Sequence, residues 1–242
     1  MRSVSLVFPA GKPVPVWRAD QIDCAVGGMA ARPSGHAALD AELPGGGWPA
    51  GGLIELLLPA PGCGEVRLLA PVLAAASLLW IAPPFIPYAP ALAGLGLALE
   101  RLTIVTPASA ADAAWAAEQA LRAGALSAVL WWQAEAHTAA MPATLRRLHL
   151  AAEEGRTPLF ALRPAAMRMQ SSPAPLRLAL EPAASQGLTV EVFKRRGPPM
   201  AAPLVLTLPG GPALRRPRRA LQPTPREPLH AVVRPVPERA AA

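Results

Sequence analysis

The chain has little lysine, cysteine and tyrosine. Its 242 residues include two cysteines and one tyrosine, and its only lysines are Lys12 and Lys194. Cys24 and Cys63 lack the C-x-x-C spacing of a metal cluster. The four histidines, at positions 36, 137, 149 and 230, are not paired with carboxylates or cysteines at ligand spacing. The sequence therefore predicts no metal site and no histidine-based catalysis.

Charge is absent from a long stretch. No charged residue occurs between Arg67 and Glu100, and the run from Leu68 to Ile86 is long enough to suggest a membrane span. Five prolines would break a spanning helix repeatedly, namely Pro71, Pro83, Pro84, Pro87 and Pro90. We therefore expect a buried helix and strand here, with no membrane insertion. Because Met1 to Pro9 lacks the features of a signal peptide, we expect a cytoplasmic protein.

Positive charge is concentrated at the C-terminal end. Residues 1–193 carry 13 basic and 14 acidic side chains, whereas residues 194–242 carry 10 basic and 2 acidic ones. The final segment is also rich in proline, which predicts an extended or disordered tail. Four arginines at the centre of this segment could neutralise DNA phosphates, namely Arg215, Arg216, Arg218 and Arg219. The alternative is a solvated tail that reflects biased composition, and no aromatic residue among these arginines supports base stacking.

The length and composition fit one globular domain with tails. Apolar residues make up 52% of the chain and charged residues 16%, which favours a compact core. We expect residues 1–29 to form an N-terminal segment with a short helix near Pro15 to Cys24. Residues 30–208 should form the core domain, and residues 209–242 the basic tail.

An altered phosphate loop follows the predicted strand from Ile54 to Leu58. In a P-loop, G-x-x-x-x-G-K-[ST], backbone N–H groups surround the phosphates, lysine contacts them and Ser/Thr binds Mg²⁺. This chain reads Pro59-Ala60-Pro61-Gly62-Cys63-Gly64-Glu65-Val66. Glu65 therefore stands at the lysine position and Val66 at the hydroxyl position. A carboxylate there would repel a triphosphate.

The surrounding segments resemble the ATPase core of the RecA recombinase family. The resemblance begins with S-G-x-x-x-L-D at Ser34 to Asp40 and L-x-x-G-G-x-P-x-G at Leu43 to Gly51. It continues through predicted strands at Leu78 to Ile81, Leu102 to Val105 and Ala125 to Trp132, with helices near Tyr88 to Gly94 and Ser109 to Gly124. It implies a three-layer α/β domain with a mainly parallel sheet and a degenerate P-loop.

In the same alignment, this chain lacks the catalytic groups of that family. Pro84 occupies the position of the catalytic carboxylate, and Trp132 that of the strand-end aspartate that positions Mg²⁺. Because phosphoryl transfer depends on these charges, we expect a non-enzymatic protein without a cofactor. Trp132 is predicted to plug the vacated nucleotide pocket or to anchor a partner. An ATPase with a relocated lysine is the enzymatic alternative, with Lys12 or Lys194 as candidates.

Within this superfamily the chain most resembles the ImuA family, bacterial accessory proteins of damage-induced mutagenesis. Besides Pro33 to Gly52, the likeness is carried by Val16 to Asp20, Ala110 to Gly124, Leu145 to Gly155 and Val190 to Pro199. The part from Gln119 to Pro164 is also similar to SulA, the damage-induced inhibitor of cell division.

The ImuA resemblance implies an accessory role in translesion DNA synthesis during the SOS response. Its partners would be an ImuB-like relative of Y-family polymerases and RecA, with recruitment to the nucleoid on DNA damage. RecA relatives carry subunit-bridging lysines where this chain has Lys194, Arg195 and Arg196, which become candidates for self-association, partner or DNA contacts. The alternative is a SulA-like inhibitor that acts on the tubulin-like division protein.

Overall fold

The computed structural model describes residues 5–7, 13–15, 31–133, 141–184 and 187–208. Its helices are α2 (Ala37–Asp40), α3 (Glu65–Leu73), α4 (Ala89–Gly94), α5 (Ala110–Ala123) and α6 (Met141–Glu154), with 3-10 turns η1 (Leu99–Arg101) and η2 (Ala165–Met169). Its strands are β1 (Ser5–Val7), β2 (Pro13–Pro15), β3 (Ala31–Arg32), β4 (Trp48–Pro49), β5 (Gly52–Leu58), β6 (Leu78–Ile81), β7 (Leu102–Val105), β8 (Ala128–Trp132), β9 (Pro158–Pro164), β10 (Leu176–Pro182), β11 (Gly187–Lys194) and β12 (Leu204–Thr207).

One eight-stranded sheet organises the fold, in the order β12-β11-β10-β5-β9-β8-β6-β7. The strands from β10 to β7 are mutually parallel, whereas β11 and β12 add antiparallel strands at one edge. Two pairs of short antiparallel strands, β1-β2 and β3-β4, form separate sheets. The predicted α/β class with a mainly parallel sheet is confirmed, and the arrangement is consistent with a three-layer RecA-like domain.

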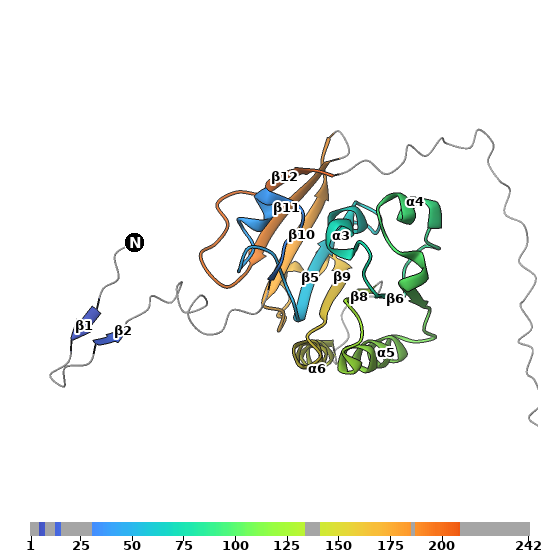
Figure 1. The fold of residues 1–242 in the computed structure, drawn as a ribbon, viewed down its shortest axis with the longest axis horizontal. Helices are drawn as coiled ribbons and strands as arrows, with labels where there is room; N and C mark the ends of the chain where they lie inside the picture. Colours follow the sequence, from blue (N-terminus) through green and yellow to red (C-terminus); the bar gives the residue numbers. More distant parts are fainter. Residues whose placement is uncertain (1–4, 8–12, 16–30, 134–140, 185–186, 209–242) are drawn as a thin grey trace, which may run out of the picture. The chain divides into compact units, whose positions relative to one another are not determined.

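Helices cover both faces of the large sheet (Figure 1). One apolar core joins α3 and α4 to the sheet through residues such as Leu69 and Leu92, and the other joins α5 and α6 through residues such as Leu121 and Leu148. Strands β5, β6 and β8 are buried along their whole length. The continuous apolar sequences of β6 and β8 follow from this burial on two faces, whereas β5 also contains Glu55.

Most predicted core elements are present at their expected places. Helix α5 begins after Ser109, whose hydroxyl accepts the Asp112 N–H at 3.1 Å, and it ends at Gly124 with a left-handed φ of 61°. Strand β8 begins three residues later than expected, because Ala125 to Ser127 form the turn out of α5. Strand β11 runs antiparallel to β10, a direction that the sequence did not predict.

The terminal segments are described only in part. Pro15 ends β2, and the rest of the predicted helix up to Cys24 lies outside the described residues, as does the basic tail from residue 209. Among the residues that are described, no helix is both long and apolar enough to cross a membrane. The uncharged run from Leu68 is divided between α3 and β6.

The approach motif S-G-x-x-x-L-D forms a compact turn against α3. The Ser34 N–H donates to the Asp40 carboxylate at 2.7 Å, and the buried Ser34 hydroxyl accepts the His36 N–H at 3.1 Å. Gly35 has φ +83°, and a Cβ there would lie 2.4 Å from Pro71 Cβ in α3. Close packing therefore requires glycine at this position. The motif thereby holds α3, and with it the altered loop, in place on the sheet.

We expect Gly35→Ala to destabilise the domain more than its matched control, Gly46→Ala. Both glycines have positive φ, which costs alanine about 1–2 kcal/mol, but Gly46 has no atom within 4 Å of the added Cβ. The clash with Pro71 should add about 1–3 kcal/mol for Gly35. Urea unfolding followed by circular dichroism measures the difference. Equal losses in the two variants would contradict the close packing.

Candidate functional site

The altered loop connects the central strand β5 to the start of α3. Residues 59–62 are exposed, and the chain turns inward at Gly64, where φ is 127° and helix α3 begins. A loop of this kind presents backbone N–H groups at a helix N-terminus, where negative charge is favoured. The loop therefore keeps the backbone form of an anion-binding site.

The carboxylate of Glu65 fills this anion position from within the chain. Its Oε1 accepts the Gly62 N–H at 2.8 Å, and its Oε2 accepts the Gly64 N–H at 3.1 Å. The Glu65 side chain is buried, with 3% of its surface exposed. The sequence had suggested only that Glu65 repels a triphosphate. The structure adds that its carboxylate takes hydrogen-bond donors that phosphate oxygens use in a P-loop.

Cys63 lies in the same loop and is not a reactive thiol. Burial raises its pKa to about 12, and the charge and hydrogen bonding of Glu65 contribute to the shift. Since the thiolate is the nucleophile, a thiol with so high a pKa is inert near neutral pH. The neighbouring Val66 packs against the core on the α3 side. Neither residue provides a group for phosphate or metal chemistry.

The two other altered positions lie in the loop after β6 and at the end of β8. Trp132 ends β8, is 6% exposed and packs on Trp80 of β6, with ring centroids 5.1 Å apart. Pro84 is exposed in the loop after β6. Neither side chain can bind Mg²⁺ or accept a proton from water. Trp132 extends the core on the α3 side, while the anion position of the loop is filled by Glu65.

The three basic residues after β11 have different surroundings. Arg195 is held in place because its guanidinium pairs with the Glu42 carboxylate at 2.6 Å and donates to Pro198 O at 2.7 Å. The Lys194 ammonium donates to Ser172 O at 2.7 Å, and burial together with Arg177 lowers its pKa. Arg196 is exposed, whereas Arg215, Arg216, Arg218 and Arg219 lie outside the described residues.

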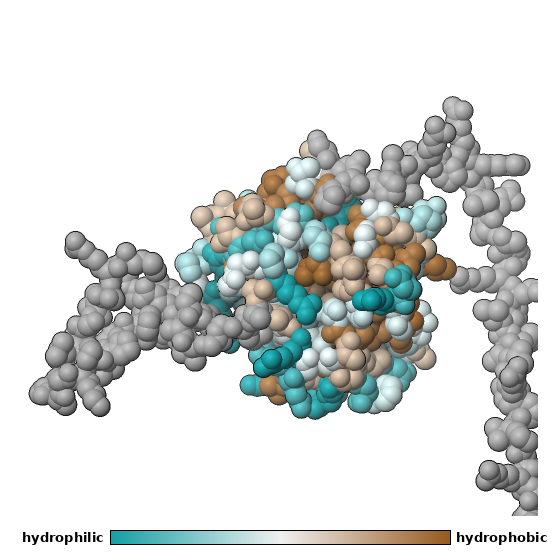
Figure 2. Space-filling view, viewed as in Figure 1, coloured by the Kyte–Doolittle hydropathy of each residue, from teal (hydrophilic) through white to brown (hydrophobic). Residues whose placement is uncertain are grey.

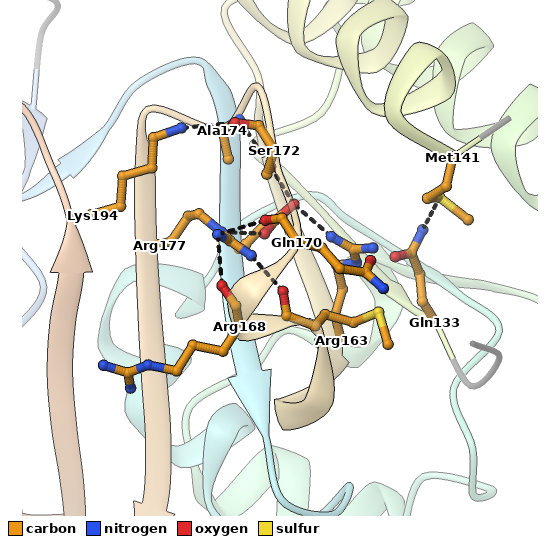
Figure 3. Close-up of polar contacts among 11 residues, drawn as sticks. Gln133, Met141, Arg163, Arg168, Gln170, Ser172, Ala174, Arg177 and Lys194 are labelled. Atoms are coloured by element: carbon orange, nitrogen blue, oxygen red, sulfur yellow. Dashed lines mark hydrogen bonds and ion pairs between the residues drawn. The ribbon is translucent and has the colours of Figure 1, made fainter. Parts of the chain in front are cut away.

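A buried ion network on the opposite face of the sheet was not foreseen. The Glu55 carboxylate accepts from Arg163 at 2.9 Å, from Arg177 at 2.7 Å and from the Ser172 hydroxyl at 2.6 Å. Glu55 is fully buried, and Arg163 and Arg177 are 3% and 5% exposed. Figure 3 shows the side chains of Arg163, Ser172 and Arg177 close together at the connection from β9 to β10. The available signal was a single charged residue inside each of the otherwise apolar strands β5 and β9, and the arginine near the start of β10.

This network fastens the connection between β9 and β10 to the sheet. Arg177 also donates to the carbonyl oxygens of Met167, Arg168 and Gln170 at 2.9–3.2 Å, which satisfies the end of η2. Farther out, Arg168 pairs with Glu191 at 2.7 Å and lies over the Phe193 ring at 4.6 Å. These charged contacts thus hold the connection on the sheet, whereas packed helices cover the sheet elsewhere in the fold.

The described residues contain no group of three or more potential metal-ligating side chains. His36 lies near Leu68 O, and His149 accepts the Leu53 N–H through Nδ1 at 3.2 Å. Burial lowers the pKa of His149, the charge of Glu153 opposes this shift, and the charges of Arg196 and Lys194 add to it. Both histidines therefore have structural contacts, while His137 and His230 lie outside the described part of the chain.

The comparisons with known proteins find similarity among solved structures. No family model matches the chain, and no curated protein matches it. SulA from Pseudomonas aeruginosa is similar, with 28% sequence identity over 46% of this chain and 96% of that chain, at a TM-score of 0.37.

We expect Glu55→Gln to lower the free energy of unfolding by about 3–5 kcal/mol, because it leaves two buried guanidinium groups without their carboxylate. The matched control is Glu191→Gln, which breaks a half-exposed pair and should cost at most about 1 kcal/mol. Denaturant unfolding of both variants measures the difference. A small loss for Glu55→Gln would contradict the structural role of the network.

We also expect Cys63 to resist alkylation while the protein is folded. In a Cys24→Ser background at pH 8.5, a pKa of about 12 leaves on the order of one thiol in a thousand or fewer as thiolate. Iodoacetamide labelling followed by mass spectrometry should therefore be far slower than in urea. Glu65→Gln should accelerate labelling, because it removes a negative charge beside the thiol. Labelling of the folded chain at the unfolded rate would contradict this environment.

Proposed function

We propose that this chain is a non-catalytic RecA-like accessory protein of SOS-induced translesion DNA synthesis that acts by binding other proteins. One observation carries the non-catalytic part: the buried Glu65 carboxylate already accepts the N–H groups of Gly62 and Gly64. A triphosphate would have to displace this carboxylate without help from a lysine or a Mg²⁺ ligand. The role in mutagenesis is supported by the sequence resemblance to the ImuA family.

The geometry around Lys194 also supports a non-enzymatic role. Lys194 is in register with Arg177, and Arg177 with Glu55, so the lysine lies two strands away from β5 and level with its middle. The altered loop follows the end of β5, and the Lys194 ammonium is bonded to Ser172 O. A lysine held there is poorly placed to replace the missing P-loop lysine.

By the same resemblance, the partners would be an ImuB-like polymerase relative and RecA. Arg196 and the arginines of the tail are the candidates for DNA contacts, and self-association through the region after β11 is a further expectation. Arg195 is poorly suited to contact a partner, because Glu42 and Pro198 already engage its guanidinium. No cofactor is required in this proposal.

A SulA-like inhibitor of cell division is the second candidate, favoured by the sequence likeness of Gln119 to Pro164. The two functions predict different phenotypes. An inhibitor would cause filamentation when the chain is expressed in undamaged cells. An accessory mutagenesis protein would leave undamaged cells unchanged, and its deletion would reduce mutations induced by ultraviolet light.

We expect no MgATP binding with a dissociation constant below about 1 mM, which corresponds to about 4 kcal/mol. A helix N-terminus contributes only about 0.3–1 kcal/mol toward an exposed anion, and here Glu65 competes for it. Isothermal titration of the full chain measures this, with RecA as the positive control. Saturable binding in that range, or ATP turnover abolished by Lys194→Ala, would contradict the proposal.

Pull-down from damage-treated cells tests the positive part of the proposal. We expect the ImuB-like protein or RecA to be enriched with the tagged chain relative to an unrelated tagged protein. Enrichment of the tubulin-like division protein instead would favour the second candidate. Enrichment of none of these would reject both.

A further inference from the structure

A histidine of helix α6 is bonded to the backbone of the central strand β5. The Nδ1 atom of His149 accepts the Leu53 N–H at 3.2 Å. The imidazole thus supplies the acceptor for a backbone N–H of β5 just before β10 begins to pair with that strand at Ile54. Gly52 allows the close approach, because a Cβ there would lie 3.3 Å from the imidazole Cε1. His149 therefore joins a surface helix to the middle of the sheet.

This bond requires a neutral imidazole. Nδ1 can accept the Leu53 N–H only through its lone pair, so the imidazole proton is on Nε2, which lies 3.4 Å from the Glu153 carboxylate one turn farther along α6. A protonated imidazole carries a hydrogen on both nitrogens and would direct its Nδ1–H at the Leu53 N–H. Leu53 is fully buried, and a buried N–H without an acceptor is costly. Protonation of His149 therefore breaks the contact between α6 and β5.

The surroundings of His149 let protons reach the imidazole and set its pKa. The side chain is 17% exposed, at the boundary between the buried face of α6 and its outer surface, where hydrophilic residues lie (Figure 2). Burial holds the pKa below its ordinary value of 6.5. Glu153 on α6 favours the protonated form, whereas Arg196 and Lys194, at the end of β11 and just after it, disfavour it. The imidazole therefore stays neutral near pH 7 and becomes charged in mildly acidic solution.

We propose that His149 is a pH-sensitive contact, which releases helix α6 from the start of β5 when its imidazole takes up a proton from solvent. The bond that is lost is the one from the Leu53 N–H to Nδ1. Leu145 and Leu148 of the same helix pack in the apolar core on this face of the sheet, so release of α6 loosens that core. This inference does not depend on the proposed function.

Stability should depend on pH through this contact. Because the pKa of His149 is lower in the folded than in the unfolded chain, its contribution is complete above pH 6.5 and is lost as the pH falls from 6.5 toward the lowered pKa. One such proton lowers the folding equilibrium constant by up to about tenfold per pH unit. The matched variant is His149→Asn, whose amide oxygen accepts the Leu53 N–H but does not titrate. In urea unfolding between pH 7.5 and 5.5, we expect the wild type to lose stability more steeply than His149→Asn.

NMR titration of the full chain tests the contact itself. We expect the His149 imidazole to carry its proton on Nε2 at pH 7.5 and to titrate below 6.5, and the Leu53 amide resonance to shift with the same midpoint. The Ala82 amide, which is bonded to Val105 O, should not follow this titration. Glu153→Gln should lower the midpoint further, because it removes the charge that favours the protonated form.

A Leu53 amide that does not follow His149, or a His149 midpoint at or above 6.5, would overturn the proposal. If the wild type unfolds before His149 titrates, the comparison with His149→Asn decides. Unfolding of the variant at a lower pH than the wild type supports the proposal, whereas unfolding of both at the same pH overturns it. If His149→Asn does not fold, the titration of the wild type and of Glu153→Gln gives the answer.

Discussion

The negative charge of Glu65 inside its own loop is the interaction on which the functional account depends. In a P-loop without phosphate the backbone N–H groups need another acceptor, and a buried donor left unpaired is costly. Here the donors of Gly62 and Gly64 are satisfied by a residue of the following helix turn. The loop can therefore keep its form without a nucleotide. An incoming triphosphate would have to compete for these N–H groups with the Glu65 carboxylate, which belongs to the chain itself.

The rest of the domain supports this loop and the other surface loops. The apolar cores on both sides of the sheet fix the helices, and the Glu55 network fixes the connection from β9 to β10, which contains the 3-10 turn η2. Breaking such a buried network is costly, although an apolar replacement could be equally stable. The network fixes the path of the chain between β9 and β10. The surface loops are presented on this support.

The sequence predicted those parts of the fold that depend on local patterns. The apolar runs of β6 and β8, and the serine and glycine that flank α5, specify elements through burial and capping, which short sequences encode. It did not predict that Glu55 meets Arg163 and Arg177, because their sequence separations of 108 and 122 residues are bridged only by the folded sheet. For Glu65 the sequence identified the missing lysine but not where the carboxylate points, which depends on the turn at Gly64.

The central claim is that Glu65 holds the loop amides, and amide hydrogen exchange measured by NMR tests it most directly. A hydrogen bond to a charged acceptor contributes about 1.5–3 kcal/mol, and 1.4 kcal/mol corresponds to a factor of ten. The account predicts that Glu65→Ala accelerates exchange of the Gly62 and Gly64 amides by about tenfold or more. The Ala82 amide, bonded to Val105 O, should exchange at an unchanged rate. Unchanged exchange at Gly62 and Gly64 would contradict the claim.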